Sequence, residues 1–125
     1  MGTLQSLVDK LARSPEQARA ENCRAWACTV AQATPIVEVT PRHQVKVAGI
    51  IRNIRIDPRS GSASIEATIT DGTGELVARW LGRRPFTGMR LGRGLIVEGV
   101  AGLGDDGELV ILNPEYRVAV GPEHP

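Results

Sequence analysis

Arginines are the residues of this chain best suited to chemistry, because a guanidinium binds phosphate and carboxylate groups through two parallel N–H donors. The formal net charge is only +1, but residues 42–97 hold ten cations against four carboxylates, whereas residues 98–125 hold one cation against six carboxylates. Nine of the ten cations in residues 42–97 are arginines. The ten are Arg42, Lys46, Arg52, Arg55, Arg59, Arg79, Arg83, Arg84, Arg90 and Arg93. This asymmetry favours an anionic partner over a surface that only water solvates.

Metal and disulfide chemistry find little support in the sequence. Cys23 and Cys28 are five residues apart in a predicted helix, so their side chains point to different faces and should not form a bridge. The chain offers His43 and His124 besides, which does not make a set of four zinc ligands. We therefore expect no metal and no other cofactor.

Catalytic motifs are also missing from the sequence. It holds no Gly-x-x-x-x-Gly-Lys-Ser/Thr phosphate loop. Neither histidine has a companion nucleophile and orienting acid that the sequence identifies. Asp71 and Glu75 flank a tight turn, and they are more simply explained as hairpin residues than as a pair of catalytic acids. The sequence therefore predicts that the protein is not an enzyme.

The elements that must position the arginines are mostly β-strands. Asp71-Gly72-Thr73-Gly74 separates two alternating, β-branched or apolar segments, residues 64–70 and 75–81, and so predicts a hairpin. A second hairpin joins Leu95–Gly102 to Glu108–Asn113 through residues 104–107, and a long strand from Val45 to Ile56 precedes both. One long strand followed by two hairpins is what a small five-stranded Greek-key barrel such as the OB-fold requires. The predicted fold class is therefore mainly β.

The alternation along the strands predicts which side chains face the barrel interior. In the first strand Val45, Val47, Gly49 and Ile51 share one parity, and Ile50, Ile54 and Ile56 share the other. We expect the inward parity to switch near Gly49 through a glycine-assisted bulge, which leaves Lys46 and Arg55 outside. Burying a lone guanidinium is costly, so Arg79 should face solvent and Trp80 should lie in the core.

The first third of the chain is predicted to be helical. Leu4, Leu7, Val8 and Leu11 recur at the spacing of one helical face. Ser14-Pro15-Glu16-Gln17 then supplies an N-cap, a first-turn proline and a capping-box glutamine for a second helix, which ends before Thr34-Pro35. The apolar side of this second helix is Cys23, Trp26, Ala27 and Val30. Such helices should cover one end of the barrel, or else form a homodimer through Leu4, Leu7 and Leu11.

These expectations divide the chain into an N-terminal helical segment (1–41) that packs on the barrel, an OB-fold domain (42–120) and a C-terminal tail (121–125). No apolar run approaches the roughly 20 residues that span a bilayer. The segment Met1 to Lys10 lacks the basic start and apolar block of a signal peptide. We expect a cytoplasmic protein with no membrane partner.

Several segments also carry a resemblance to known proteins. They are Val45-Lys46-Val47-Ala48-Gly49, Asp71-Gly72-Thr73-Gly74, Trp80-Leu81, Leu91-Gly92-Arg93-Gly94-Leu95-Ile96-Val97-Glu98-Gly99 and Asn113-Pro114-Glu115-Tyr116. Together they resemble the OB-fold of the wedge domain of the branched-DNA helicase RecG and the small stand-alone OB-fold proteins of actinobacteria that bind nucleic acid. The resemblance covers residues 42–120, and the helical leader matches the stand-alone group alone. The helicase motor is absent.

The resemblance implies a non-catalytic module that binds single-stranded or branched DNA, or RNA. Its phosphate contacts would come from the Arg-rich barrel face, and Phe86 would wedge or stack against a base. Leu81 stands where many OB-folds that bind single strands place a stacking aromatic, and the acidic turn Asp105-Asp106 would repel phosphates. The alternative is an adaptor that binds a protein partner through the same face or through the helices. The candidate site residues are Lys46, Arg55, Arg79, Arg83, Arg84, Phe86 and Arg90.

Overall fold

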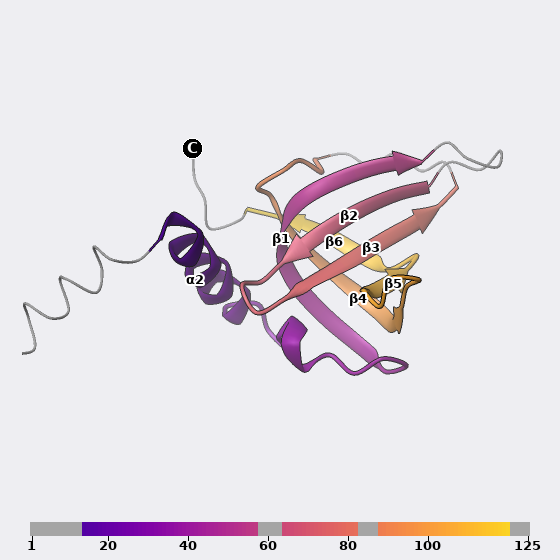
Figure 1. Cartoon of the computed structure of the whole chain (residues 1–125), viewed down its shortest axis with the longest axis horizontal. Coiled ribbons are helices and arrows are strands. Elements are labelled where there is room, and N and C mark those ends of the chain that lie inside the picture. The colour runs from indigo at the N-terminus through magenta and orange to yellow at the C-terminus, as the bar shows by residue number, and fades with distance from the viewer. Residues whose placement is uncertain (1–13, 58–63, 83–87, 121–125) are drawn as a thin grey trace, which may run out of the picture.

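A computed structural model describes residues 14–57, 64–82 and 88–120 of the chain (Figure 1). It contains the α-helix α2 (Pro15–Cys28), the short 3₁₀ helix η1 (Ile36–Glu38) and one mixed sheet. The strands of the sheet are β1 (Gln44–Asp57), β2 (Ser64–Thr70), β3 (Glu75–Leu81), β4 (Gly94–Leu103), β5 (Leu109–Leu112) and β6 (Glu115–Ala119). The mainly β prediction and both predicted hairpins are confirmed.

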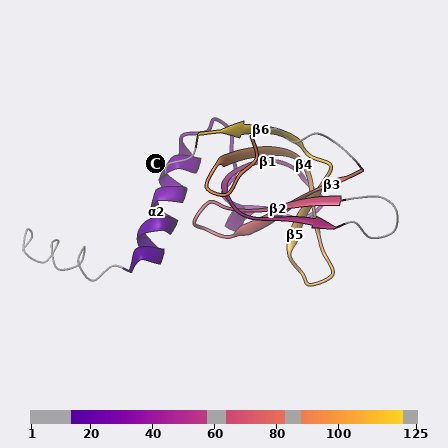
Figure 2. The ribbon, with the colours of Figure 1, turned by 90° about the horizontal axis from the view of Figure 1, so that it is seen from above.

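Five of the strands close into a barrel in the order β1-β2-β3-β5-β4, because β1 also pairs with β4. Figure 2 shows this ring from above, with the β4–β5 hairpin projecting from the barrel wall. The first half of the long strand β1 pairs with β4, and its second half pairs with β2. All pairings are antiparallel except that of β3 with β5. This is the predicted five-stranded Greek-key barrel.

Strand β6 was not predicted, and it extends β5 along the same edge of β4. Ala101 pairs with Ile111 and Glu98 pairs with Glu115, so the β5–β6 side carries one residue more than β4. The extra residue lies around Asn113, which has a φ of 50°, and Pro114, which has no N–H to donate. A bulge at Asn113-Pro114 therefore separates two strands that run along one partner.

The bulge of β1 lies at Arg52, so the predicted parity switch near Gly49 was misplaced. Ile51 pairs with Ile69, but Asn53 pairs with Thr68, which leaves Arg52 as the extra residue. Gly49 has a different role. A Cβ there would lie 3.0 Å from the carbonyl oxygen of Thr70, so glycine lets β1 pass close to β2 where it changes partners. The predicted inward position of Ile56 was also wrong, because its side chain is 67% exposed.

Trp80 lies at the centre of the barrel with no exposed surface, as predicted. Its Nε1–H donates to the carbonyl oxygen of Pro114 at 3.0 Å, and its ring meets Tyr116 edge-on at a centroid distance of 5.2 Å. The core around it also includes Val47 of β1, Ile69 of β2, Leu95 of β4 and Ile111 of β5. Buried apolar side chains on every wall of the barrel thus hold the closed sheet together.

Helix α2 begins with the predicted capping box. The Ser14 hydroxyl accepts from the Gln17 N–H at 3.1 Å, and the Gln17 side chain accepts from the Ser14 N–H at 3.0 Å. The helix ends at Cys28, earlier than predicted, and the first predicted helix, with Leu4 and Leu11, lies outside the described residues.

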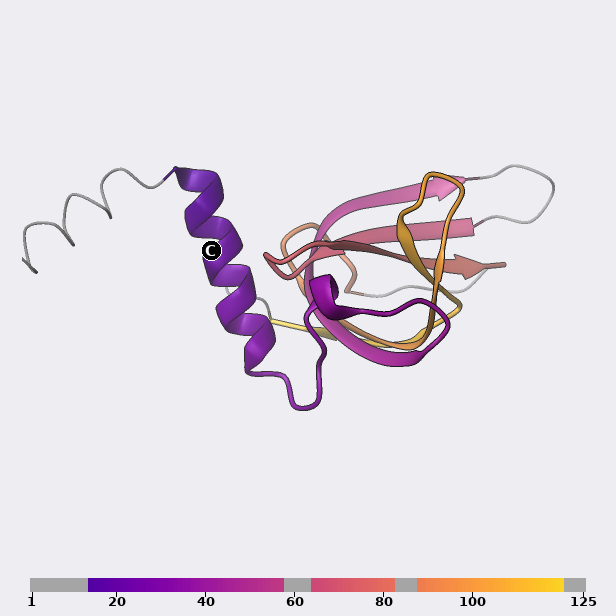
Figure 3. The ribbon, with the colours of Figure 1, turned by 60° about the horizontal axis from the view of Figure 1, so that its bottom comes forward.

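Helix α2 stands beside the end of the barrel that holds the β2–β3 turn (Figure 3). Ala27 packs with Ala48 of β1 and Ile96 of β4, which explains why these two outward positions are buried. Two glycines let the helix approach closely. A Cβ at Gly72 would overlap the carbonyl oxygen of Ala20, and a Cβ at Gly94 would lie 2.5 Å from the ring of Trp26.

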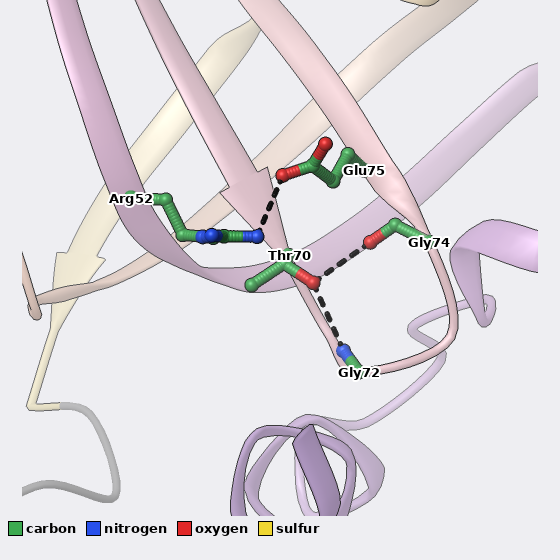
Figure 4. Close-up of polar contacts among 5 residues, drawn as sticks. All are labelled: Arg52, Thr70, Gly72, Gly74 and Glu75. Carbon is green, nitrogen blue, oxygen red and sulfur yellow. Dashed lines mark hydrogen bonds and ion pairs between the residues drawn. The ribbon is translucent and has the colours of Figure 1, made fainter. Parts of the chain in front are cut away.

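The Asp71-Gly72-Thr73-Gly74 turn also anchors η1. The buried Asp71 carboxylate accepts from the N–H of Ile36 at 2.8 Å and from the N–H of Thr73 at 2.9 Å, and the Thr73 hydroxyl accepts from the N–H of Val37 at 3.1 Å. The Thr70 hydroxyl closes the turn, accepting from the Gly72 N–H and donating to the Gly74 carbonyl (Figure 4). Asp71 is therefore a structural residue, as the sequence indicated.

In the described residues, no helix is both long and apolar enough for a membrane crossing.

Candidate functional site

The candidate site is a cleft of about 710 Å³ on the outside of the barrel. One wall is the outer face of β1, β2 and β3, and the other is the β4–β5 hairpin. The cations Arg42, Arg55 and Arg79 line the cleft together with the carboxylates Glu66, Asp105, Asp106 and Glu108. Arg55 and Arg79 lie on the strand wall, Arg42 lies in the turn before β1, and three of the four carboxylates lie on the hairpin, so most of the negative charge is opposite the strand wall.

A row of charged side chains crosses the strand wall of the cleft. Arg55 of β1 pairs with Glu66 of β2, and Glu66 pairs with Arg79 of β3. Directly opposite residues have their Cβ atoms about 5 Å apart on the same face of a sheet. The Nε and Nη2 atoms of Arg79 both lie 2.7 Å from Glu66 Oε1. Arg79 therefore faces outward, as predicted, but as one half of a partly buried ion pair.

Arg42 was counted among the cations of the sequence but was not named as a site residue. It follows Pro41 in a turn and has a φ of 73°, in the left-handed region. Its N–H donates to the carbonyl oxygen of Ala101 at 2.7 Å, which ties the turn to β4 at the edge of the cleft. Turn residues in the left-handed region are usually Gly or Asn. Because an arginine occupies the position here, the sequence contains no clear sign of this turn.

The tip of the β4–β5 hairpin is held by Glu108. Its Oε1 atom accepts from the Asp106 N–H at 3.1 Å, and its carbonyl oxygen accepts from the Gly104 N–H at 2.7 Å. A Cβ on Gly104 would overlap the Glu108 carboxylate. Asp105 and Asp106 are left exposed at the tip of the wall that faces the arginines.

Aliphatic side chains make up the rest of the cleft lining. Val100 is 56% exposed, Leu103 is 63% exposed and Leu112 is 53% exposed, so all three offer apolar surface to a ligand. Among the described residues, none of the cleft-lining side chains is aromatic. The described lining of the cleft thus supports apolar contact with a ligand but not stacking on an aromatic ring.

The structure brings together two of the predicted site residues, Arg55 and Arg79. Lys46 lies instead in a shallow hollow of about 210 Å³ formed by β1, β4 and β6, where Glu98, Glu115 and Arg117 also lie. Arg90 is exposed in the segment before β4. The predicted contacts Arg83, Arg84 and Phe86 lie outside the described residues.

Arg52 is a cation that the fold directs away from the cleft. Its Nη1 atom lies 2.9 Å from Glu75 Oε2, across the start of the β2–β3 hairpin (Figure 4). Both side chains are more than half exposed. Arg52 also lines a hollow of about 540 Å³ between α2 and the barrel.

Cys23 is buried and Cys28 is exposed, and neither is in a disulfide. Within residues 14–57, 64–82 and 88–120, no three His, Cys, Asp or Glu side chains gather closely enough to hold a metal ion.

Comparison with known proteins identifies the fold. No family model and no curated protein matches the chain. The structure of RecG bound to a three-way DNA junction matches 68% of this chain with a TM-score of 0.59 and 17% identity. The chain has an OB-fold. A replication protein A heterotrimer bound to single-stranded DNA is also similar, with a TM-score of 0.48 and 19% identity over 62% of the chain.

The match spans only a small part of the larger of these proteins. It covers 12% of the RecG chain and 57% of the replication protein A chain. At such identities the similarity shows the fold alone. Any activity of this OB-fold must therefore be argued from its own cleft.

Proposed function

We propose that this chain is a non-catalytic nucleic-acid-binding protein that holds phosphates with Arg42, Arg55 and Arg79. The observation that carries the proposal is the place of the cleft. It lies on the face of strands β2 and β3 next to the β4–β5 loop, and OB-folds bind oligonucleotides at this face. The DNA junction bound in the RecG structure agrees with this class of ligand.

The charge of the cleft limits how a nucleic acid is held. With Arg55 and Arg79 on the strand wall and three of the four carboxylates on the hairpin, the phosphates of a bound strand follow β1, β2 and β3. Its sugars and bases then meet the aliphatic side chains of Val100, Leu103 and Leu112. Because stacking on aromatic rings contributes about 1–3 kcal/mol per base in other single-strand binders, its absence from this lining implies weak binding, with a Kd of about 1–100 micromolar.

The finer parts of the proposal rest on the sequence. Single-stranded or branched DNA is the proposed ligand, with RNA as the alternative. Arg83, Arg84 and Phe86 follow β3, the strand that carries Arg79, and we propose that they extend the contact along the strand. Arg90 and Lys46 would add phosphate contacts away from the cleft. The 42–120 range is the proposed binding domain.

A protein adaptor is the second candidate function. It is favoured by the same lining, which combines arginines, carboxylates and exposed aliphatic side chains. Such a surface suits a polypeptide partner that carries both positive and negative charges. In that case the arginines would pair with carboxylates of the partner rather than with phosphates. A homodimer through Leu4, Leu7 and Leu11 belongs to this alternative.

Fluorescence anisotropy against single-stranded, duplex and branched DNA and against RNA tests the first proposal. Two to three phosphate contacts predict that log affinity falls with log salt at a slope of about −1.4 to −2 for a single strand. Replacing both Arg42 and Arg55 by Ala should weaken binding to all sequences and flatten the slope by about 1.4, the effect of two phosphate contacts. The matched control is Arg52→Ala, which removes a cation of β1 outside the cleft and should leave the slope unchanged.

Failure of binding has a definite consequence. If about 100 micromolar protein binds no nucleic acid at about 50 mM salt, affinity lies below the usual range of non-specific binding, and the adaptor replaces this proposal. If the Arg52→Ala control weakens binding as much as the cleft variant does, the cleft is not the site.

A further inference from the structure

We propose that Glu66 is an internal competitor for the ligand, which holds Arg79 in the free protein and must give it up when a phosphate binds. This inference rests on the proposed nucleic-acid function and names the residue that limits its affinity. Binding then exchanges one ion pair for another. The net gain in binding free energy is therefore smaller than the number of arginines in the cleft suggests.

The geometry of the Glu66–Arg79 pair carries the proposal. Two nitrogen atoms of the guanidinium converge on one oxygen of Glu66, each at 2.7 Å. The side chain of Arg79 is 35% exposed and that of Glu66 is 21% exposed. The carboxylate is therefore less accessible than the cation that it holds, so a ligand reaching Arg79 comes close to Glu66.

Glu66 also faces the second arginine of the row. Arg55 is its direct partner on the neighbouring strand β1, so Glu66 lies between two arginines of adjacent strands. A phosphate that bridges Arg55 and Arg79 would be placed against this carboxylate. Like charges at such distances repel, and partial burial reduces screening by solvent. Glu66 thus opposes the binding mode that the two arginines favour.

The chain supplies a matched pair of residues for comparison. Glu75 holds Arg52 at 2.9 Å, and these residues belong to β3 and β1, the same strands that carry Arg79 and Arg55. Neither Glu75 nor Arg52 lines the cleft. Glu75 precedes Arg79 by four residues, which is about 13 Å along a strand and exceeds the Debye length of about 8 Å at physiological salt. Removing either glutamate adds one unit to the net charge and releases one arginine.

The test compares Glu66→Gln with Glu75→Gln by anisotropy, using a fluorescent single-stranded oligonucleotide at several salt concentrations. Glu66→Gln should lower the Kd by about three- to tenfold, since it frees a partly buried cation. It should also steepen the salt slope by about 0.7, because no freed carboxylate then takes up a cation and offsets the counterion release at the Arg79 phosphate contact. Glu75→Gln should change the Kd by less than about twofold, because its pair is exposed. A change in stability alone would not alter the salt slope.

In an Arg79→Ala background, Glu66→Gln should tighten binding less than it does in the natural protein, because the guanidinium that it would free is missing and only the repulsion of a phosphate at Arg55 is relieved. The inference is overturned if Glu66→Gln binds no better than the natural protein, or if Glu75→Gln improves binding equally, which would make the effect one of net charge. If the natural protein binds no nucleic acid, the proposed function fails, and this inference fails with it. If the natural protein binds through Arg42 and Arg55 and the Glu66 variant shows no gain, this inference alone fails.

Discussion

Arg42 shows how a single residue ties backbone conformation to the cleft. A non-glycine residue in the left-handed region costs about 1–2 kcal/mol, and Arg42 holds a φ of 73° at the cleft edge. Strained positions of this kind are kept where the side chain has a use. A cation at the edge of a proposed phosphate site is such a use.

Two substitutions of Arg42 distinguish its effect on backbone strain from its effect on ligand binding. Arg42→Gly should raise the free energy of unfolding by about 0.5 kcal/mol, because relief of the left-handed strain exceeds the added entropy of the unfolded chain. Arg42→Ala keeps the strain and should not be stabilised. Both variants lose the guanidinium and should bind a single strand equally weakly. Urea denaturation and anisotropy measure the two quantities. Equal stability of the two variants would show that the backbone at position 42 is not strained.

At the scale of elements, the attachment of α2 depends on where glycines allow contact. Helix α2 buries two of its residues, Cys23 and Ala27. It approaches the barrel closely at Gly72, which has a φ of 86° and no room for a Cβ beside the Ala20 carbonyl. The turn that reverses the β2–β3 hairpin thus also supports the helix.

Gly72→Ala should therefore destabilise the protein more than a turn glycine normally does. Both the positive φ and the overlap with Ala20 oppose the methyl group, and we expect a loss of about 2–4 kcal/mol. The matched control is Gly107→Ala, since Gly107 has a φ of 80° but open space around it, and should cost about 1 kcal/mol. Urea denaturation followed by circular dichroism compares the two. Equal losses would mean that α2 is not held at this turn.

At the scale of the whole molecule, the closed barrel and α2 differ in how they are held. The barrel is closed by backbone pairing around five strands and by a core that contains Trp80. Helix α2 is held by the small cluster around Ala27 and by its contact with the β2–β3 turn. Elements with few buried apolar contacts open locally at a lower free energy than the core does.

Native-state hydrogen exchange should resolve these two levels of stability. Amides in the middle of β1 and β4 should exchange only through global unfolding, while amides of α2 should exchange through a local opening at least about 1–2 kcal/mol lower in free energy. Gly72→Ala should lower the protection of α2 more than that of β4. Equal protection of α2 and the central strands would show instead that the two unfold as one unit.

The sequence by itself determined those features that depend on neighbours along the chain. Glycine-rich turns set the two hairpins, alternation placed Trp80 inside and Arg79 outside, and Ser14 with Gln17 marked the start of α2. These features follow from backbone conformation and from periods of two residues, which any short segment reveals.

Only the tertiary structure decided the features that depend on distant segments. The bulge at Arg52 and the continuation of β5 into β6 follow from which strand each residue pairs with. The cleft appears because the β4–β5 hairpin lies against the outer faces of β1, β2 and β3. Composition showed an excess of arginines, but the fold assigned Arg55 and Arg79 to the cleft, paired Arg79 with Glu66 and directed Arg52 elsewhere. Such pairings join residues 11 to 23 positions apart, and no local pattern records them.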